Sequence, residues 1–363
     1  MTVPLLHWLD PARAATFAHW LSAVAPQHAL QIDSVRLASA DASFRRYFRI
    51  DAANATGSCI IMDAPPSLED CAPFVKVAAL MAEAGLHAPR VLAWDEALGF
   101  MLLSDLGAQT MLDLIAPPAE PLAIAEATPA HLDLYIDAVE LLVRWQLASR
   151  PGVLPAYDDA LLSRELALFP DWYVGRHRGF ALDAGLMGRL EPMFAQIKAS
   201  NLGSLDAARV FVHRDFMPRN LMVSQSGALG VLDFQDAVYG PISYDIASLM
   251  RDAFLSWDEE FVLDITVRYW QRAQKAGLPV DSDFGEFYKA VEWMGLQRHL
   301  KVAGIFARLT LRDGKPRYLA DTPRFLSYIR ATASRYRELT PLLRLVDEVE
   351  GTQQTAAFVF GRV

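Results

Sequence analysis

Asp215, Asn220 and Asp233 provide two carboxylates and one amide within the stretch 211–237, FVHRDFMPRNLMVSQSGALGVLDFQDA. Asp215 and Asn220 fall on a predicted loop between two short apolar runs, and Asp233 ends the next apolar run. Because the two strands of a hairpin bring their ends to nearly the same place, we expect these side chains to lie near one another. Carboxylate and amide oxygens are the ligands that Mg²⁺ takes in proteins. The stretch therefore predicts a magnesium site formed by Asn220 and Asp233.

The same spacing favours phosphoryl transfer. An Asp-x4-Asn loop followed by a strand-borne aspartate is the catalytic-loop and metal-site arrangement of kinases. In that arrangement Asp215 accepts a proton from the attacking hydroxyl, while His213 braces the loop. The alternative is a set of turn residues that only cap strands, which is the usual interpretation of any one such residue. The order and spacing of the whole set favour the kinase interpretation.

The surrounding elements predict an α+β protein with two lobes. A chain of 363 residues is too long for one compact core. Residues 30–107 predict strand, turn, strand, helix, strand, strand, which is a small antiparallel sheet with one helix. A helix is expected at 8–26, before this sheet, and Asp10-Pro11 is its start signal. A Pro- and Ala-rich loop is expected at 116–130, and mostly helical segments follow it, at 131–150, 158–200, 258–276 and 284–307.

Composition narrows the class of protein further. Hydrophobic residues make up 53% of the chain and charged residues 21%, which is typical of a globular protein. The net charge of −9 is unfavourable for binding nucleic acid or an anionic membrane. Two cysteines form no disulfide framework, and the sequence has no signal peptide and no membrane-spanning segment. We expect a cytoplasmic protein, and the sequence leaves its oligomeric state open.

The segment 213–252, HRDFMPRNLMV…GVLDFQDAVYGPISYDIASLMRD, resembles the aminoglycoside phosphotransferase family, relatives of protein kinases that phosphorylate small molecules. The resemblance implies a protein-kinase-like fold with an antiparallel-sheet N-lobe at 1–107 and a mostly helical C-lobe at 108–363. It also implies ATP and Mg²⁺ as cofactors. In the family, the aspartate that matches Asp245 supports the catalytic loop.

The predicted nucleotide site departs from protein kinases. The turn ASADASFRRYFRI has no glycine. We expect Ser43, nearby backbone amides and the guanidinium groups of Arg45 and Arg46 to hold phosphate instead. The hinge is expected at Asp105 and Leu106, with adenine pairing to the backbone there.

The strand IIMDA lacks the lysine that holds the phosphates in protein kinases, because Met62 and Asp63 occupy its end. Lys76 or an arginine of the preceding turn is a candidate replacement. The missing lysine also supports a rival interpretation, a catalytically dead scaffold that binds nucleotide.

The phrases SFRRYFR, MDAPP, FMLLSDLG and DFQDAVYGPISYD resemble one branch of the family, the N-acetylmuramate/N-acetylglucosamine kinases of bacterial cell-wall recycling. That resemblance implies phosphorylation of the anomeric C1 hydroxyl of an amino sugar. Because N-acetylmuramate carries a carboxylate, its pocket is expected to offer cations. The candidate substrate residues are Arg298 and Lys301 on one helical face, with Trp172 and Tyr173 as stacking rings. Aminoglycoside, choline, homoserine and fructosamine kinases are the alternatives within the family.

Overall fold

The computed structural model describes residues 8, 10–40, 44–53, 57–116, 122–203 and 208–352. The chain divides into two compact units. The first unit consists of Met1–Thr110 and Asn220–Asp236, and the second of Met111–Arg219 and Ala237–Val363. The sequence predicted a boundary at residue 107, and here the chain leaves the first unit after Thr110 and returns to it for one short segment.

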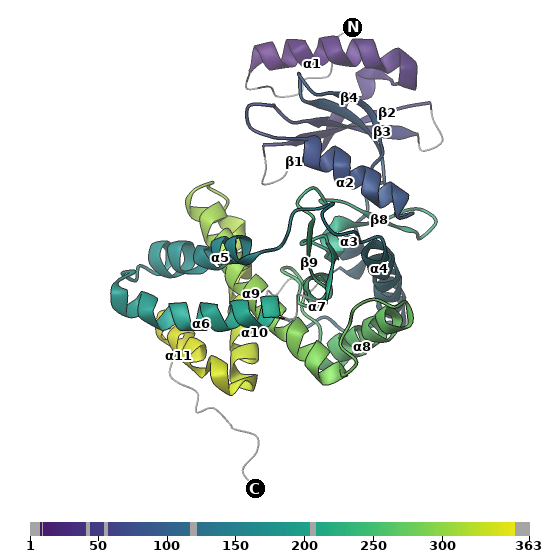
Figure 1. The fold of residues 1–363 in the computed structure, drawn as a ribbon. Helices are drawn as coiled ribbons and strands as arrows, with labels where there is room; N and C mark the ends of the chain where they lie inside the picture. Colours follow the sequence, from purple (N-terminus) through teal and green to yellow (C-terminus); the bar gives the residue numbers. More distant parts are fainter. Residues whose placement is uncertain are drawn as a thin grey trace. The chain divides into compact units, whose positions relative to one another are not determined.

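The first unit is built on a five-stranded antiparallel sheet in the order β1-β2-β3-β5-β4 (Figure 1). The predicted strands and both predicted helices of this region are confirmed. The elements of the first unit are α1 (Pro11–Val24), β1 (Arg36–Ala40), β2 (Arg46–Asp51), β3 (Ser58–Asp63), α2 (Ala72–Glu83), β4 (Val91–Asp95), β5 (Phe100–Ser104), β7 (Leu221–Val223) and β8 (Leu229–Val231).

Helix α1 covers one face of this sheet, and α2 lies on the opposite face (Figure 1). The start predicted at Asp10-Pro11 is confirmed, because the Asp10 carboxylate accepts a hydrogen bond from the backbone N–H of Ala12. Phe17 on α1 is fully buried against Phe48 and Phe100 of the sheet. Alternate residues of each strand supply this core because strand side chains point to opposite faces in turn.

The hairpin β7–β8 packs within the first unit although it follows more than a hundred residues of the second unit. Its register pairs Leu221 with Val231, and the backbone N–H of Val231 donates to the carbonyl of His87 at 2.8 Å. Phe234, just beyond the hairpin, is fully buried against Phe74 of α2, with ring centroids 4.8 Å apart. These contacts fix the two ends of the hairpin, which carry Asn220 and Asp233.

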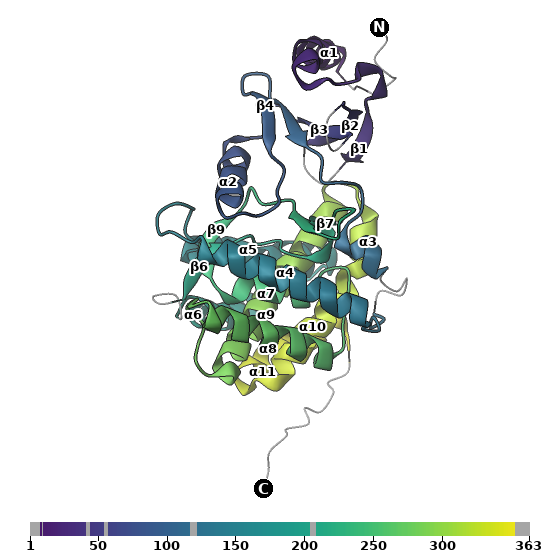
Figure 2. The ribbon, with the colours of Figure 1, turned by 90° about the vertical axis from the view of Figure 1, so that its right-hand side faces the viewer.

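The second unit is mostly helical, as the sequence predicts (Figure 2). Its long helix α9 is buried along most of its length. The elements of this unit are α3 (Met111–Ile115), α4 (Pro129–Leu147), α5 (Asp159–Leu168), η3 (Phe169–His177), α6 (Ala184–Gly203), β6 (Arg209–Val212), η4 (Pro218–Asn220), β9 (Val238–Pro241), α7 (Ser243–Met250), α8 (Glu259–Lys275), α9 (Phe284–Leu311), η5 (Pro316–Asp321), α10 (Thr322–Arg335), η6 (Arg337–Leu339) and α11 (Thr340–Glu350).

Two local features of the second unit concern residues predicted to serve the site. Strands β6 and β9 pair antiparallel, and the loop that begins at His213 leaves the end of β6. Segment η3 is a π-helix rather than the ordinary helix predicted there. Pro170 lies in its first turn and has no N–H to continue the α5 hydrogen-bond ladder, which accounts for the wider turn.

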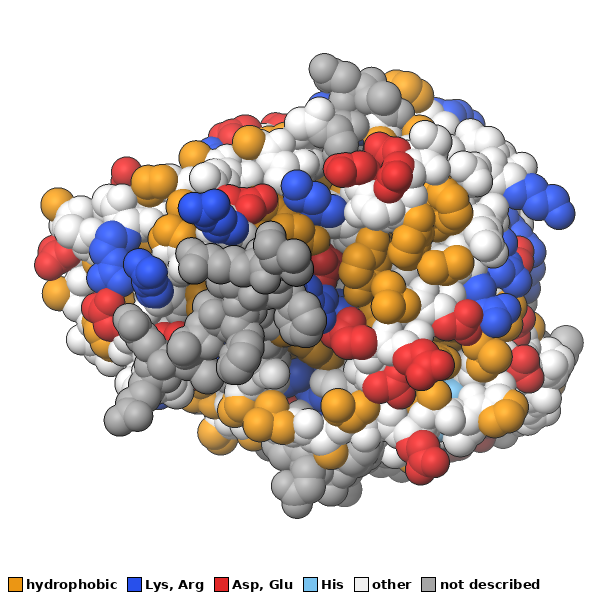
Figure 3. All heavy atoms as spheres, turned by 90° about the horizontal axis from the view of Figure 1, so that it is seen from below, with side chains coloured by type: hydrophobic (Ala, Val, Ile, Leu, Met, Phe, Trp, Pro, Cys, Tyr) orange, Lys and Arg blue, Asp and Glu red, His pale blue; other side chains and the backbone are white. Residues whose placement is uncertain are grey.

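The face of the molecule seen in Figure 3 mixes acidic, basic and apolar side chains, as on an ordinary solvated surface. Within the described ranges, no helix has both the length and the apolar character needed to span a membrane. The predicted α+β class, with a small antiparallel sheet and a mostly helical remainder, is confirmed.

Candidate active site

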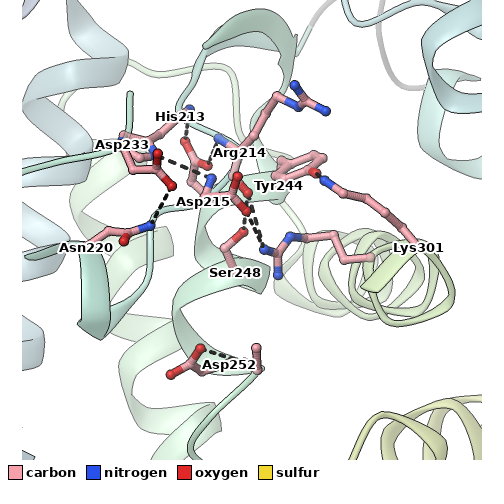
Figure 4. A network of polar contacts seen from close by, with 12 residues as sticks. His213, Arg214, Asp215, Asn220, Asp233, Tyr244, Ser248, Asp252 and Lys301 are labelled. Carbon is pink, nitrogen blue, oxygen red and sulfur yellow. Dashed lines mark hydrogen bonds and ion pairs between the residues drawn. The ribbon is translucent and has the colours of Figure 1, made fainter. Parts of the chain in front are cut away.

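The loop after β6 is fixed through its backbone (Figure 4). The fully buried carboxylate of Asp245, on α7, accepts hydrogen bonds from the backbone N–H groups of His213 at 2.7 Å and Arg214 at 2.9 Å. The ring of His213 is also buried, and its Nδ1 accepts from the backbone N–H of Asp215 at 3.2 Å. Burial raises the pKa of Asp245 to about 6, against the opposing effect of His213 and these N–H groups. Such an arrangement is what a loop-supporting role for Asp245 and His213 requires.

Asp215 presents its carboxylate beside buried cations of α9. Its side chain is 32% exposed, and its Oδ1 lies 3.4 Å from a guanidinium nitrogen of Arg298. Burial opposes ionisation of Asp215, but Lys301 and Arg298 outweigh it and hold the pKa below its usual value. The group is therefore an ionised carboxylate at neutral pH, able to accept a hydrogen bond and a proton from a bound hydroxyl.

Arg298 and Lys301 share one face of α9, as their spacing predicts. Both cations lie over the ring of Tyr244, at 5.5 Å and 5.8 Å from its centroid. Lys301 donates to the Tyr244 hydroxyl at 3.1 Å and pairs with Glu165 at 3.2 Å. Arg298 also donates to the backbone carbonyl of Arg214 at 3.2 Å. The structure thus brings both predicted substrate cations to the catalytic loop.

Asn220 and Asp233 meet at the two ends of the β7–β8 hairpin. The Asn220 amide nitrogen lies 3.4 Å from Oδ2 of Asp233, and Gln235 donates to Oδ1 of Asp233 at 2.9 Å (Figure 4). Asp233 has a φ of 62° and Arg214 a φ of 77°, and residues other than glycine adopt this left-handed region at a cost. Such strain is concentrated at functional sites.

The donor set at this hairpin suits a hard cation. A rotation of the Asn220 amide would present its oxygen beside the Asp233 carboxylate, and both are ligand types for Mg²⁺. Among the residues that the structure describes, no three His, Cys, Asp or Glu side chains form a cluster able to hold a metal. Two protein oxygens suit Mg²⁺, which completes its shell with water and substrate phosphates.

The three residues predicted to hold phosphate differ in their surroundings. Ser43 lies outside the described residues. Arg45 is buried and pairs with Glu69 at 3.0 Å. Arg46 pairs with the buried carboxylate of Asp63 at 2.5 Å. These pairs give both arginines a structural partner within the first unit, so a phosphate role for either stays a prediction.

Asp63, which takes the place of the expected strand lysine, ties α1 to the sheet. Its carboxylate also accepts from Arg13 at 2.7 Å. A lysine at this position would face two arginines, so the departure from protein kinases has a structural reason. Lys76, the lysine named as a candidate replacement, is exposed on α2.

The predicted hinge residues are both buried. Asp105 accepts from Arg49 at 2.6 Å and from Ser58 at 2.8 Å. Burial opposes its ionisation, but these hydrogen bonds hold the pKa of Asp105 below its usual value. The Leu106 side chain packs against Gly230 of β8, where a Cβ would come within 2.9 Å of it. Their side chains hold the chain in place, and adenine pairing to the backbone here stays a prediction.

Trp172 and Tyr173 lie in η3 rather than at the catalytic loop. The Tyr173 ring is buried and stacks on Phe169, and its hydroxyl donates to Glu350 of α11 at 2.7 Å. This environment favours a structural role for Tyr173. Trp172 is half-buried, with the guanidinium of Arg176 at 4.0 Å from its ring centroid. Sugar stacking by either ring stays a prediction.

Known proteins resemble this chain in sequence. The Phosphotransferase enzyme family matches residues 34–279. The chain belongs to this family. An N-acetylmuramate/N-acetylglucosamine kinase of Pseudomonas aeruginosa is 50% identical over 309 residues, covering 85% of this chain and 86% of that protein. The enzyme of the same name from Neisseria meningitidis serogroup B is 46% identical over 343 residues, covering 94% and 97%.

Solved structures of other proteins share the fold at low sequence identity. A choline kinase of Streptococcus pneumoniae superposes with a TM-score of 0.61 at 11% identity, covering 88% of this chain and 99% of that one. An aminoglycoside phosphotransferase with bound ADP gives a TM-score of 0.57 at 13% identity, covering 88% and 98%. The family resemblance stated from the sequence is confirmed, and the chain is a phosphotransferase of the kinase type.

Sequence reasoning missed several residues around the catalytic loop. Glu165 on α5, Gln297 on α9 and Ser248 on α7 all contact Arg214, directly or through Glu165. Tyr244 stands out in the sequence only as the neighbour of Asp245. No local pattern marks Glu165, because a glutamate on an amphipathic helix is ordinarily a solvated residue. Only its burial distinguishes it.

Proposed function

We propose that this phosphotransferase moves the γ-phosphoryl group of ATP to the anomeric hydroxyl of N-acetylmuramate and N-acetylglucosamine. The observation that carries the acceptor assignment is identity of 46% and 50%, over 94% and 85% of the chain, to two kinases named for these sugars. The low-identity structural relatives share the fold and carry no argument about the acceptor.

Asp215 would act as the base. Its ionised carboxylate is held on a loop that Asp245 fixes, so it can orient the sugar hydroxyl and take its proton as the oxygen attacks phosphorus. The partial exposure of Asp215 leaves it accessible to a small acceptor. Placement of the hydroxyl and stabilisation of developing charge then supply most of the acceleration.

Arg298 is the stronger of the two predicted acceptor-binding cations. Its Nε is buried and has no hydrogen-bond partner among the described residues, although the guanidinium lies beside Asp215. A buried donor without a partner is costly, so an oxygen of the acceptor is a suitable complement. Lys301 is already engaged by Glu165 and Tyr244 and is better suited to hold the loop.

Asn220 and Asp233 would hold Mg²⁺ against the phosphates of the nucleotide. The bound cation would neutralise charge on the transferring group. Only four residues along the chain separate Asn220 from Asp215, so their Cα atoms, five steps apart, are at most about 18 Å from one another. This short connection supports a common role for both residues at one phosphoryl group.

The proposal is tested by phosphorus NMR of products formed from ATP with N-acetylmuramate, N-acetylglucosamine, choline and kanamycin. We expect a sugar 1-phosphate from the two amino sugars. Asp215→Asn removes the proton acceptor, so turnover should fall at least roughly 10³-fold while ADP still raises the melting temperature. Asp264→Asn, at an exposed ion pair of α8, is the control and should keep full activity. Near-normal turnover by Asp215→Asn, or phosphorylation of choline or kanamycin alone, would contradict the proposal.

A further inference from the structure

The residue before the catalytic base has a strained backbone that its neighbours hold in place. Arg214 has a φ of 77°, in the left-handed region that costs non-glycine residues about 1–2 kcal/mol. Its N–H donates to Asp245 at 2.9 Å, and its carbonyl accepts from Ser248 and Arg298, each at 3.2 Å. Because the next residue is Asp215, any relaxation of this conformation would turn the catalytic carboxylate away from its position.

The side chain of Arg214 ends on a carboxylate buried beneath the loop. Glu165 on α5 is 4% exposed, and its Oε1 pairs with Arg214 at 2.5 Å and with Lys301 at 3.2 Å. Its Oε2 accepts from the Tyr157 hydroxyl at 2.9 Å and from the Gln297 amide at 2.8 Å. Four donors on one carboxylate fill the positions that its lone pairs offer. Glu165 is therefore fully satisfied only when it is ionised and both cations are present.

Glu165 is one of several charged groups around the loop. The buried or partly buried cations are Arg214, Lys301 and Arg298, and the anions are Glu165, Asp215 and Asp245. Asp252 also acts on Arg298, and His213 acts on Asp215 and Asp245. Loss of the Glu165 charge would shift the net charge of this group by one unit toward positive. Without Glu165 two cations would lose their common partner, and both of them act electrostatically on Asp215, which directly follows Arg214 in the chain.

We propose that Glu165 is a positioning residue that keeps Arg214 and Lys301 from drawing the Asp215 carboxylate into ion pairs beyond its contact with Arg298, and so keeps it available as a base. This inference rests on the proposed function, since it concerns the same proton transfer. Glu165 itself contacts neither substrate nor nucleotide in this role. It acts by anchoring the side chain of a strained residue and by neutralising the two cations.

The first test is Glu165→Gln, assayed with ATP and N-acetylglucosamine. The isosteric amide keeps the volume but removes the charge, so we expect kcat to fall roughly 10- to 100-fold with KM for ATP within about twofold. The acid limb of the kcat/KM profile should move to lower pH, because two unneutralised cations lower the pKa of Asp215 further. A purely structural role would change stability without moving that limb.

The second test is the pair Arg214→Gly and Glu165→Gln/Arg214→Gly. Glycine adopts a positive φ without strain and carries no cation, so the double variant has the same net charge around the loop as wild type. We expect it to regain most of the kcat that Glu165→Gln loses. A folded double variant no more active than Glu165→Gln would overturn the proposal, and so would a Glu165→Gln enzyme as active as wild type.

The matched control is Glu292→Gln. Glu292 is another buried carboxylate that pairs with an arginine, Arg335, and accepts from a tyrosine hydroxyl, Tyr336, but it has no contact with the loop. It should leave the pH profile unchanged. If Glu165→Gln shows no cooperative thermal transition, it is not folded, and the proposal is tested on the double variant alone. The proposal then requires the double variant to be folded and active. Turnover of the wild-type enzyme is measured first, so that failure of the proposed function is seen separately.

Discussion

At the scale of single residues, two positions with strained backbones lie among the residues predicted to do the chemistry. Arg214 and Asp233 are both held at positive φ, one directly before the predicted base and the other the predicted metal ligand itself. Strain of this kind persists only where surrounding contacts over-determine the conformation. Here the contacts include Asp245 and Glu165 for Arg214, and Asn220 and Gln235 for Asp233.

Glu165 should also leave a signature in acid stability. Burial opposes its ionisation, but Lys301 and Arg214 lower its pKa from 4.5 to about 2. A folded-state pKa below the unfolded value gives stability that is present above pH 4.5 and is lost as pH falls through about 2. The contribution is on the order of 3 kcal/mol. Urea unfolding between pH 6 and pH 2.5 measures it.

Glu165→Gln should be less stable at neutral pH and should lose less stability than wild type on acidification. Asp264→Asn changes only an exposed ion pair, so its free energy of unfolding should vary with pH as that of wild type does. If the free energies of unfolding of wild type and Glu165→Gln fell in parallel with pH, the Glu165 carboxylate would not titrate in this range.

At the scale of elements, the packing of the second unit centres on the buried helix α9. From one buried stretch it supplies Arg298 to the loop, Lys301 to Tyr244 and Glu165, and Gln297 to Glu165. Close approach of its neighbours is possible because Gly304 has no side chain. A Cβ at Gly304 would lie 2.2 Å from the backbone oxygen of Leu168, where α5 ends and η3 begins.

Gly304→Ala should therefore destabilise the protein by about 2–3 kcal/mol, because backbone of one element must move. Gly188→Ala is the matched control. Gly188 is an exposed position of α6 with nothing within 4 Å of an added Cβ, so alanine there should stabilise by about 0.5–1 kcal/mol through helix propensity alone. Thermal unfolding of both variants measures the difference. Equal melting temperatures would contradict the close packing of α9 against this junction.

At the scale of the whole molecule, the chain leaves the first unit, forms much of the second, and returns for one hairpin. That hairpin carries the predicted metal ligands, so they depend on packing between segments far apart in sequence. Phe234 is the anchor of the returning segment, fully buried against Phe74 of α2.

Phe234→Ala should lower stability by about 3–5 kcal/mol, as expected for a large buried ring. Hydrogen exchange followed by mass spectrometry should show lost protection in α2 and in β7–β8. Phe287→Ala is the control within the second unit, where the ring stacks on Tyr269 of α8, and it should deprotect α8 and α9 instead. If Phe234→Ala left α2 as protected as in wild type, the returning segment would not be part of that unit.

The sequence by itself determined the element types and the order of the chemical groups. Periodicity predicted the sheet, α1 with its Asp10 cap, and the long helices of the second unit, because these signals are local to a few turns or strands. The spacing of Asp215, Asn220 and Asp233 is a signal of the same local kind. The π-helix at η3 was missed because only the interruption at Pro170 hints at it.

Only the tertiary structure decided which of the charged residues serve the catalytic loop. Glu165 and Lys301 are separated by more than a hundred residues yet share an ion pair, whereas Tyr173, which the sequence predicted to stack on a sugar, is buried against Phe169. Sequence pattern cannot distinguish a buried charge from a solvated one, since both lie on helices of the same periodicity. The free energy of a charge depends on burial and partners, which long-range packing fixes.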